Sequence, residues 1–156
     1  MTLAYAALWL LVVALGIQTG AGLFETRVLV PLWAKSPPES VLAYNATAIK
    51  ADSGHRLWIF LTPATGLISL LNLAAAWHAA EPQRTWWLAS AGTAVLIIVV
   101  TFAYFVPVLL RLPQAANVPP ASLTRTVRLW VVLNWLRFVV LILAWLAALK
   151  AFSYGA

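Results

Sequence analysis

Cysteine is absent from the sequence, which excludes disulfides, thiolate metal sites and cysteine nucleophiles. Only two histidines are present, His55 and His78, so a metal site or haem pair that needs several histidine ligands is not expected. Charged residues make up only 9% of the chain, and although the net charge is +6, the basic residues are not grouped with a nucleic-acid-binding motif. We therefore expect no metal, no other cofactor and no nucleic-acid partner.

Hydrophobic residues make up 63% of the 156 residues, a share well above that of soluble globular proteins. Four apolar runs, each close to the ~20 residues that a membrane-spanning helix requires, predict spans over about residues 3–33, 56–78, 85–111 and 127–152. The first run lacks a basic segment and a small-residue cleavage site, so we expect it to be retained rather than removed as a signal peptide. The predicted fold class is all-α: one integral membrane domain over residues 1–156, an antiparallel bundle of four transmembrane helices in the lipid bilayer.

Lysine and arginine are unevenly divided between the two ends of the predicted bundle. The connections after the first and third spans contain most of them, whereas the opposite end has only Arg84 and Lys150. Because the connections rich in basic residues stay on the cytoplasmic side of a membrane, both termini are predicted on the non-cytoplasmic side of a bacterial inner membrane.

The connections between the spans differ in character. In the first, "SPPESVLAYNATAIKADSGHR", Ser36 and Glu39 form a capping-box pattern and Gly54 is a stop signal, which predicts a short amphipathic helix between the first two spans. We expect that helix either to lie on the membrane surface or to cover the mouth of the bundle as a lid. The second connection, "HAAEPQR", predicts a tight turn, and the third, "RLPQAANVPPASLTR", predicts an ordered loop.

Each predicted helix carries its unusual polar residues in steps of three and four, which place them on one face. Because a helix rises about 1.5 Å per residue, Glu25 and Arg137 lie at matching depths, each roughly 12 Å from the same membrane face. An ionisable side chain in the hydrocarbon region is costly unless it is paired, and it usually marks a functional site. We therefore predict that Glu25 and Arg137 are partners or share a hydrated pocket, within one half of the bundle. The stripes are Gln18, Gly22 and Glu25 in the first span; His55, Trp58, Thr62, Thr65, Ser69 and Asn72 in the second; Thr101, Tyr104, Val108 and Arg111 in the third; and Trp130, Asn134 and Arg137 in the fourth.

A purely structural interpretation fits the same residues. A pair of Glu25 and Arg137 can fix the register of two helices, and Thr, Ser and Asn side chains commonly join membrane helices through hydrogen bonds. Tyr104 and Trp130 also suit the headgroup region as interfacial aromatic residues. His55, at the start of a helix, fits a solvated position as well as a catalytic one.

The chain resembles the family of small four-helix membrane proteins called anthrone oxygenase-like, in the stretches "GAGLFETRVLVPLW", "HRLWIFLTP", "TFAYFVPVLLRL" and "RLWVVLNWLRFVVLILA". These stretches fall in all four predicted spans, so the resemblance extends over nearly the whole chain. The resemblance implies oxidation of an anthrone-type phenolic ring to the quinone by molecular oxygen, without flavin, haem or metal. In the third stretch Thr101 and Pro107 follow the family pattern, but Tyr104 and Phe105 stand where an asparagine is expected, which leaves the substrate open.

The chemistry that the resemblance implies assigns roles to the predicted pocket residues. An anthrone that loses a proton becomes an electron-rich anion that reacts with oxygen directly, so the protein supplies a base and stabilises charge. Glu25 or His55 would accept the proton and Arg137 would stabilise the oxyanion, while tryptophan side chains would provide flat apolar walls. The catalytic candidates are Glu25, Arg137, His55 and Tyr104, and the substrate-binding candidates are Trp58, Thr62, Thr101, Trp130 and Asn134.

Two other classes of protein remain open on the sequence. A small-molecule transporter also needs a membrane carboxylate and aromatic residues, but Arg137 at the depth of Glu25 would repel a cation. A non-catalytic binder of lipid or quinone, or an accessory subunit, is the third class, and Gly16, Gly20 and Gly22 permit close helix contact within the bundle or in a homo-oligomer. A polar stripe that faces lipid would favour a missing partner, and an enclosed stripe would favour a binding site for an apolar or aromatic small molecule.

Overall fold

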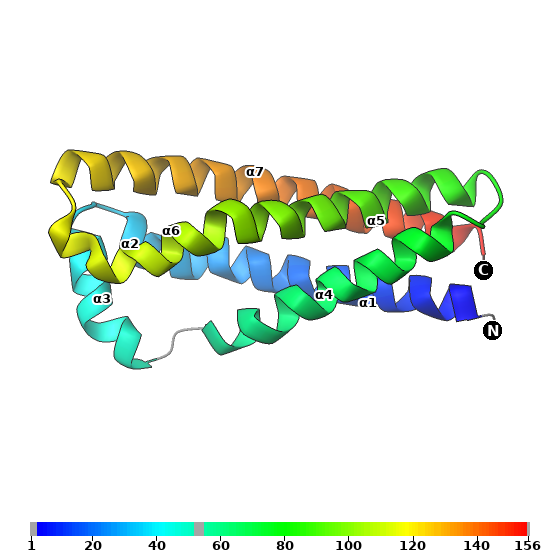
Figure 1. Ribbon diagram of the computed structural model, residues 1–156, viewed down its shortest axis with the longest axis horizontal. Helices are drawn as coiled ribbons and strands as arrows, with labels where there is room; N and C mark the ends of the chain where they lie inside the picture. Colours follow the sequence, from blue (N-terminus) through cyan, green and yellow to red (C-terminus); the bar gives the residue numbers. More distant parts are fainter. Residues whose placement is uncertain (1–2, 52–54, 156) are drawn as a thin grey trace.

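The computed structural model describes residues 3–51 and 55–155, with side chains described for 3–45 and 57–155. The predicted fold class is confirmed: four helical elements of the described chain are long and apolar enough to cross a membrane, and they run antiparallel in one bundle (Figure 1). The elements are α1 (Leu3–Phe24), η1 (Glu25–Leu29) and α2 (Val30–Ala34) in the first span; α4 (His55–Ala76) in the second; α5 (Gln83–Val100), η2 (Thr101–Phe105) and α6 (Val106–Arg111) in the third; and α7 (Pro120–Ser153) in the fourth.

The half of the bundle near the termini is held together by small residues. Ala91 and Ala94 of α5 and Ala144 and Ala148 of α7 are buried in one core cluster, and α5 and α7 are in contact. Small side chains let membrane helices approach closely, and the resulting dispersion contacts replace the hydrophobic driving force that lipid does not provide. The helices α5 and α7 therefore lie close together in this half of the bundle.

Glycines of the first span also bring helices together. A Cβ atom on Gly16 would lie 3.2 Å from the indole nitrogen of Trp145 in α7, and that nitrogen donates a hydrogen bond to the Val12 carbonyl at 3.1 Å. Gly22 faces Phe138 of the same helix, whereas Gly20 is open on the outer surface. Gly16 and Gly22 thus serve contacts inside the bundle.

The polar stripe predicted along α4 is enclosed rather than exposed to lipid. Thr65, Ser69 and Asn72 are buried, and the Ser69 hydroxyl donates to the Thr65 carbonyl at 2.7 Å. The Asn72 carbonyl oxygen accepts from the indole nitrogen of Trp87 in α5 at 2.9 Å. Asn72 thus joins α4 to α5, as the structural interpretation of the stripe expects for this part of it.

A helix between the first two spans, α3 (Glu39–Ala51), confirms the short helix predicted there. Val41 of α3 is fully buried in a core cluster that also contains Trp33 and Leu112. The Asn45 side chain donates to the Leu112 carbonyl, so α3 is fastened over the end of the bundle that contains α2 and η3 (Leu112–Asn117) (Figure 1). This placement favours the covering role over attachment to the membrane surface.

The third connection was expected to be a loop, and that prediction is wrong for most of its length. A 3-10 helix continues the third span from Leu112 to Asn117, and α7 already begins at Pro120. Proline suits the first position of a helix because its fixed φ is helical and its missing N–H is not needed there. The proline-rich composition therefore starts a helix instead of extending a loop.

The turn between α4 and α5 confirms the tight connection predicted there. Glu81 accepts hydrogen bonds from the Thr85 hydroxyl at 2.7 Å and from the Thr85 backbone N–H at 3.3 Å, and it pairs with Arg84 at 2.9 Å. The hydrogen bond from the Thr85 side chain is the main reason that the pKa of Glu81 lies below its ordinary value. An ionised carboxylate at this point caps the first turn of α5.

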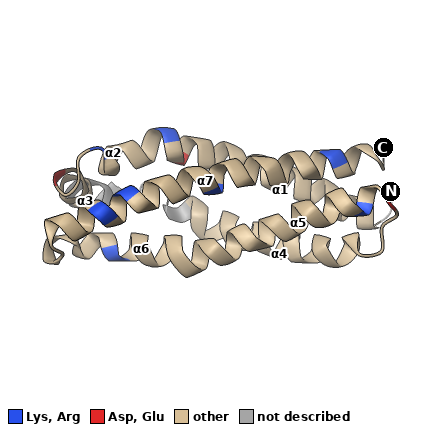
Figure 2. Cartoon of the chain, turned by 90° about the horizontal axis from the view of Figure 1, so that it is seen from above, with Lys and Arg blue, Asp and Glu red and all other residues tan. Residues whose placement is uncertain are grey.

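The distribution of charge along the bundle is asymmetric. Lys and Arg gather toward the α3 end, and few lie at the end with both termini (Figure 2). Arg27 lies on the outer surface, with its guanidinium carbon 5.6 Å from the centroid of the Trp135 ring.

Replacing Ala91 by leucine should destabilise the bundle, because the added atoms have no space between the helices. We expect a loss of about 1–3 kcal/mol, measured by unfolding in detergent micelles. The matched control Ala74→Leu adds the same atoms at an exposed position of α4 and should leave stability unchanged. Equal losses in the two variants would contradict close packing at Ala91.

Candidate functional site

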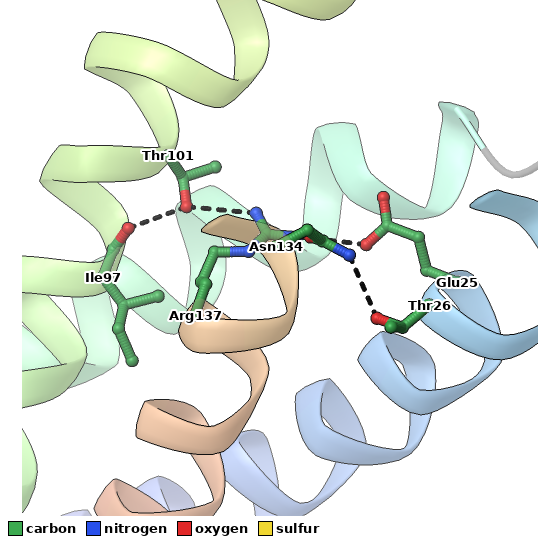
Figure 3. A network of polar contacts seen from close by, with 6 residues as sticks. All are labelled: Glu25, Thr26, Ile97, Thr101, Asn134 and Arg137. Atoms are coloured by element: carbon green, nitrogen blue, oxygen red, sulfur yellow. Dashed lines mark hydrogen bonds and ion pairs between the residues drawn. The ribbon is translucent and has the colours of Figure 1, made fainter. Parts of the chain in front are cut away.

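Arg137 of α7 is the centre of a polar network in the other half of the bundle (Figure 3). Its Nη2 donates to Glu25 Oε2 at 3.1 Å and to Asn134 Oδ1 at 2.6 Å, and its Nη1 donates to the Thr101 hydroxyl at 3.4 Å. The Arg137 and Glu25 side chains are only 18% and 13% exposed. The pairing predicted from their matching depths is confirmed.

Two π-helical turns bring the partners of Arg137 to it. Glu25 is the first residue of η1 and Thr101 is the first residue of η2. In each turn a backbone N–H bonds the carbonyl five residues earlier: that of Val30 donates to Glu25, and that of Val106 donates to Thr101. The wide turns allow the first and third spans each to present one polar side chain to the guanidinium of Arg137.

A proline explains each π turn. Pro31 and Pro107 follow the first residue of their turns by the same six positions, in "ETRVLVP" and "TFAYFVP". Proline has no N–H and its ring clashes with the carbonyl four residues earlier, so the regular α-helical ladder cannot continue through it. A π turn, with bonds that span five residues, absorbs the mismatch, and such turns often occur at functional sites.

Further contacts hold the guanidinium and its neighbours in place. The Asn134 amide donates to the Thr26 hydroxyl at 3.1 Å, and the Thr101 hydroxyl donates to the Ile97 carbonyl at 2.7 Å (Figure 3). The guanidinium carbon of Arg137 lies 4.3 Å from the centroid of the Phe105 ring, within the range of a cation–π contact. Arg137 is therefore oriented by its edges and by one face.

A cavity of about 370 Å³ lies beside this network, between α4 and the η2–α6 segment. Its size is within the range of ligand pockets, and its walls are largely apolar, with a few polar groups at one side. The lining residues are Glu25, Trp58, Ile59, Thr62, Pro63, Thr101, Phe102, Phe105, Val106, Leu109, Leu110 and Arg137.

The polar side of the cavity retains unused hydrogen-bonding groups. A guanidinium has five N–H donors. Within the described residues, the bonds to Glu25, Asn134 and Thr101 use three of these, which leaves Nε and one N–H of Nη1. The second carboxylate oxygen of Glu25 points away from Arg137 (Figure 3). A ligand in the cavity thus meets both a strong acceptor and strong donors.

A second cavity of about 20 Å³ lies on the other side of Arg137 and is large enough for one water molecule. Gln18 and Asn134 line it, and the side-chain carbonyl of Gln18 is buried with no hydrogen-bond partner among the described residues. Trp58, Thr62 and Thr101 border both cavities.

The structure brings most of the predicted site residues together. Five of them line the larger cavity, and Asn134 stands behind it and holds Arg137. The side chain of His55 lies outside the described residues, and the structure places only its backbone, as the first residue of α4. The five lining residues are Glu25, Trp58, Thr62, Thr101 and Arg137.

Tyr104 does not line the cavity, in contrast to the face predicted from an α-helical spacing. A step of three from Thr101 reaches the same face only in an α-helix, whereas a π turn contains more residues. Phe105 therefore occupies the wall one turn after Thr101, and Tyr104 packs edge-on against Phe105 with centroids 5.3 Å apart.

Trp130 is also absent from the cavity lining and is only 1% exposed. Its ring packs edge-on against Trp33 and Phe105, at centroid distances of 5.0 Å and 5.5 Å. It supports Phe105 from behind, because this part of α7 faces the core cluster at the α3 end rather than the cavity.

The apolar residues that η2, α6 and α4 contribute to the cavity walls were not predicted from the sequence. Phe102 lies off the face that an α-helix through Thr101 would present. The other wall residues lack the polar atoms that defined the stripes: Phe105, Leu109, Ile59 and Pro63. The signal that was available is the Val-Pro pair that follows both Glu25 and Thr101 at the same spacing.

No family model, curated protein or solved structure matches the chain. Among the described residues there is no group of three or more His, Asp or Glu side chains that could hold a metal ion. The support for a function is therefore the geometry of the cavity and the resemblance seen in the sequence.

Removing either partner of the ion pair should destabilise the protein, and removing the second partner should add less than removing the first. Glu25→Gln or Arg137→Gln alone leaves a charge without its partner in the bundle and should cost about 3 kcal/mol. In the double variant the loss should fall short of the sum of the single losses by about 1–3 kcal/mol. Unfolding of all four proteins in detergent measures this coupling, and additive losses would show that the two side chains act independently.

Proposed function

We propose that the larger cavity binds an apolar aromatic molecule with a hydrogen-bonding oxygen, and that the protein is a cofactor-independent oxygenase of the anthrone type. The observation that carries the proposal is the shared position of a free Glu25 carboxylate oxygen and free Arg137 N–H groups at one side of an apolar cavity. This arrangement can remove a proton from a bound ring and stabilise the resulting oxyanion.

The reaction balances with molecular oxygen as the only oxidant. The ring CH₂ opposite the carbonyl group loses one proton to give a delocalised anion, which transfers electrons to oxygen and forms a C–O bond. Loss of the second C–H proton and cleavage of the O–O bond give a second carbonyl group and one water molecule. One substrate and one oxygen molecule thus yield one quinone and one water.

Each step has a candidate residue. The Glu25 oxygen that points away from Arg137 accepts the first proton, and the spare Arg137 N–H groups stabilise the ring oxyanion. Asn134 and Thr101 hold the guanidinium, so they are positioning residues. Trp58 and Phe105 provide the flat walls. Phe105 thus has the role that was predicted for Trp130.

The ion pair weighs against cation transport. A transporter that exchanges a cation for protons needs a carboxylate whose charge is open to the substrate, but one Glu25 oxygen is bound to Arg137 at 3.1 Å. The enclosed position of the network inside the bundle also favours a site over a contact surface for a missing subunit.

The membrane location is proposed as a bacterial inner membrane, with both termini on the non-cytoplasmic side. The support is the concentration of Lys and Arg at the α3 end, opposite the termini (Figures 1 and 2). In this orientation the cavity and the Arg137 network lie in the cytoplasmic half of the bilayer.

Single cysteines can test this orientation without background labelling, because the sequence has none. Ala80→Cys, in the exposed turn between α4 and α5, should react with an impermeant maleimide added to intact cells. Ser36→Cys, exposed between α2 and α3, should react only after permeabilisation. The opposite pattern would reverse the proposed orientation.

Oxygen uptake by the purified protein with a simple anthrone, and without an added cofactor, tests the proposed activity. Uptake should exceed the spontaneous rate, and Arg137→Gln should reduce the catalysed rate by about 100-fold because the oxyanion loses its charged donor. Arg27→Gln removes the same charge from the outer surface of the first span and should leave the rate unchanged. Uptake equal to that of buffer would contradict the catalytic role, and equal effects of both variants would contradict the role of Arg137.

A further inference from the structure

We propose that the natural ligand of the cavity is a membrane-dissolved amphiphile. It enters the cavity laterally from the bilayer, between α4 and α6. Its polar aromatic part would lie against Glu25 and Arg137, and a hydrocarbon substituent would remain among the lipid chains. The inference rests on the proposed function, since it names the class and the route of the molecule that the same cavity binds.

The two long walls of the cavity come from helices that separate. α4 packs against α1 and α5 but diverges from α6 toward the α3 end (Figure 1). The cavity fills this interval, with Ile59 and Pro63 on one wall and Phe102, Val106 and Leu110 on the other. Its length therefore runs from the Arg137 network to the outer surface between the two helices.

The outer rim of the cavity is apolar and exposed. Ile59, Phe102 and Leu110 line the cavity and are at the same time 53%, 49% and 61% exposed. A residue can be both only at an edge where the cavity meets the outer surface. These residues belong to membrane-spanning segments, so the surface around the opening faces lipid chains rather than water.

The polar side of the cavity lies at its inner end. Glu25 and Arg137 are mostly buried, in contrast to the rim. A ligand with a polar ring and an apolar tail can satisfy this gradient in one orientation, with the tail directed outward.

The route from the α3 end is closed by a core cluster. Trp33, Phe105 and Trp130 stack edge-on between the cavity and that end, and Val41 of α3 packs onto the same cluster. The Thr124 hydroxyl donates to the Pro37 carbonyl at 3.1 Å, which ties the segment before α3 to α7. Among the residues whose side chains are described, access from water at this end would require the cluster to open, whereas the lateral opening exists in the structure.

The experiment uses a hydroxyanthraquinone that carries a long alkyl chain with a photoreactive diazirine at the chain end, in proteoliposomes of the full chain. The expected cross-links fall on lipid-exposed residues around the opening, such as Ile59, Phe60, Phe102 and Leu110. The same hydroxyanthraquinone without the chain should compete for them. Cross-links on α3 or η3, or labelling that the chain-free compound does not reduce, would overturn the lateral route.

Two tryptophan variants test the opening itself. Leu110→Trp narrows the rim and should lower the competed cross-linking severalfold, while Leu67→Trp, at an equally exposed position of α4 away from the cavity, should not. Equal effects of the two variants would overturn the proposal.

Direct binding of the chain-free compound separates a failure of the lateral route from a failure of the proposed function. If it binds in an Arg137-dependent manner but the tailed compound is not accepted, the lateral route and the amphiphile class are wrong and the proposed function stands. If neither compound binds, the proposed function fails, and the inference fails with it.

Discussion

A guanidinium held within the span of a lipid bilayer is the constraint on which this structure depends. An isolated charge there costs several kcal/mol, so Arg137 requires partners from several helices. The first span supplies a carboxylate, the third supplies a hydroxyl and an aromatic face, and α7 supplies Asn134 one turn away. Three of the four spans are thereby fixed in register at one level of the membrane, and the second span, α4, stands apart at this level and forms one wall of the cavity.

A gradient in side-chain size along the third span explains where the cavity forms. Its inward residues between Trp87 and Thr101 include small ones, as at Ala91 and Ala94, and the helices meet closely there. Beyond Thr101 the inward residues are large, as at Phe105, and α4 diverges. Close approach at one end and separation at the other give a bundle with a dense half and a receptive half, without any change in the overall antiparallel topology.

The four spans could be predicted because the hydropathy of a segment follows from its residue types. The partnership of Glu25 with Arg137 could be predicted because the helical rise converts position in the sequence into depth in the membrane. Tyr104 could not be placed in this way, since the prediction assumed an unbroken α-helix and the π turn moved Phe105 to the cavity wall. The stripe of the fourth span predicted Trp130 in the pocket, but the side of α7 that it occupies is covered by Trp33. Local periodicity identifies which residues share one face of a helix. Tertiary packing determines whether that face meets the cavity or another helix.

The π turn at Thr101 can also be viewed as one residue inserted into an α-helix. If the same residues instead formed a continuous α-helix, everything after the turn would be rotated by about 100°. Leu109 and Leu110 would then leave the cavity wall although their identities were unchanged. The position of this wall therefore depends on the backbone conformation of the turn as much as on the side chains that line the cavity.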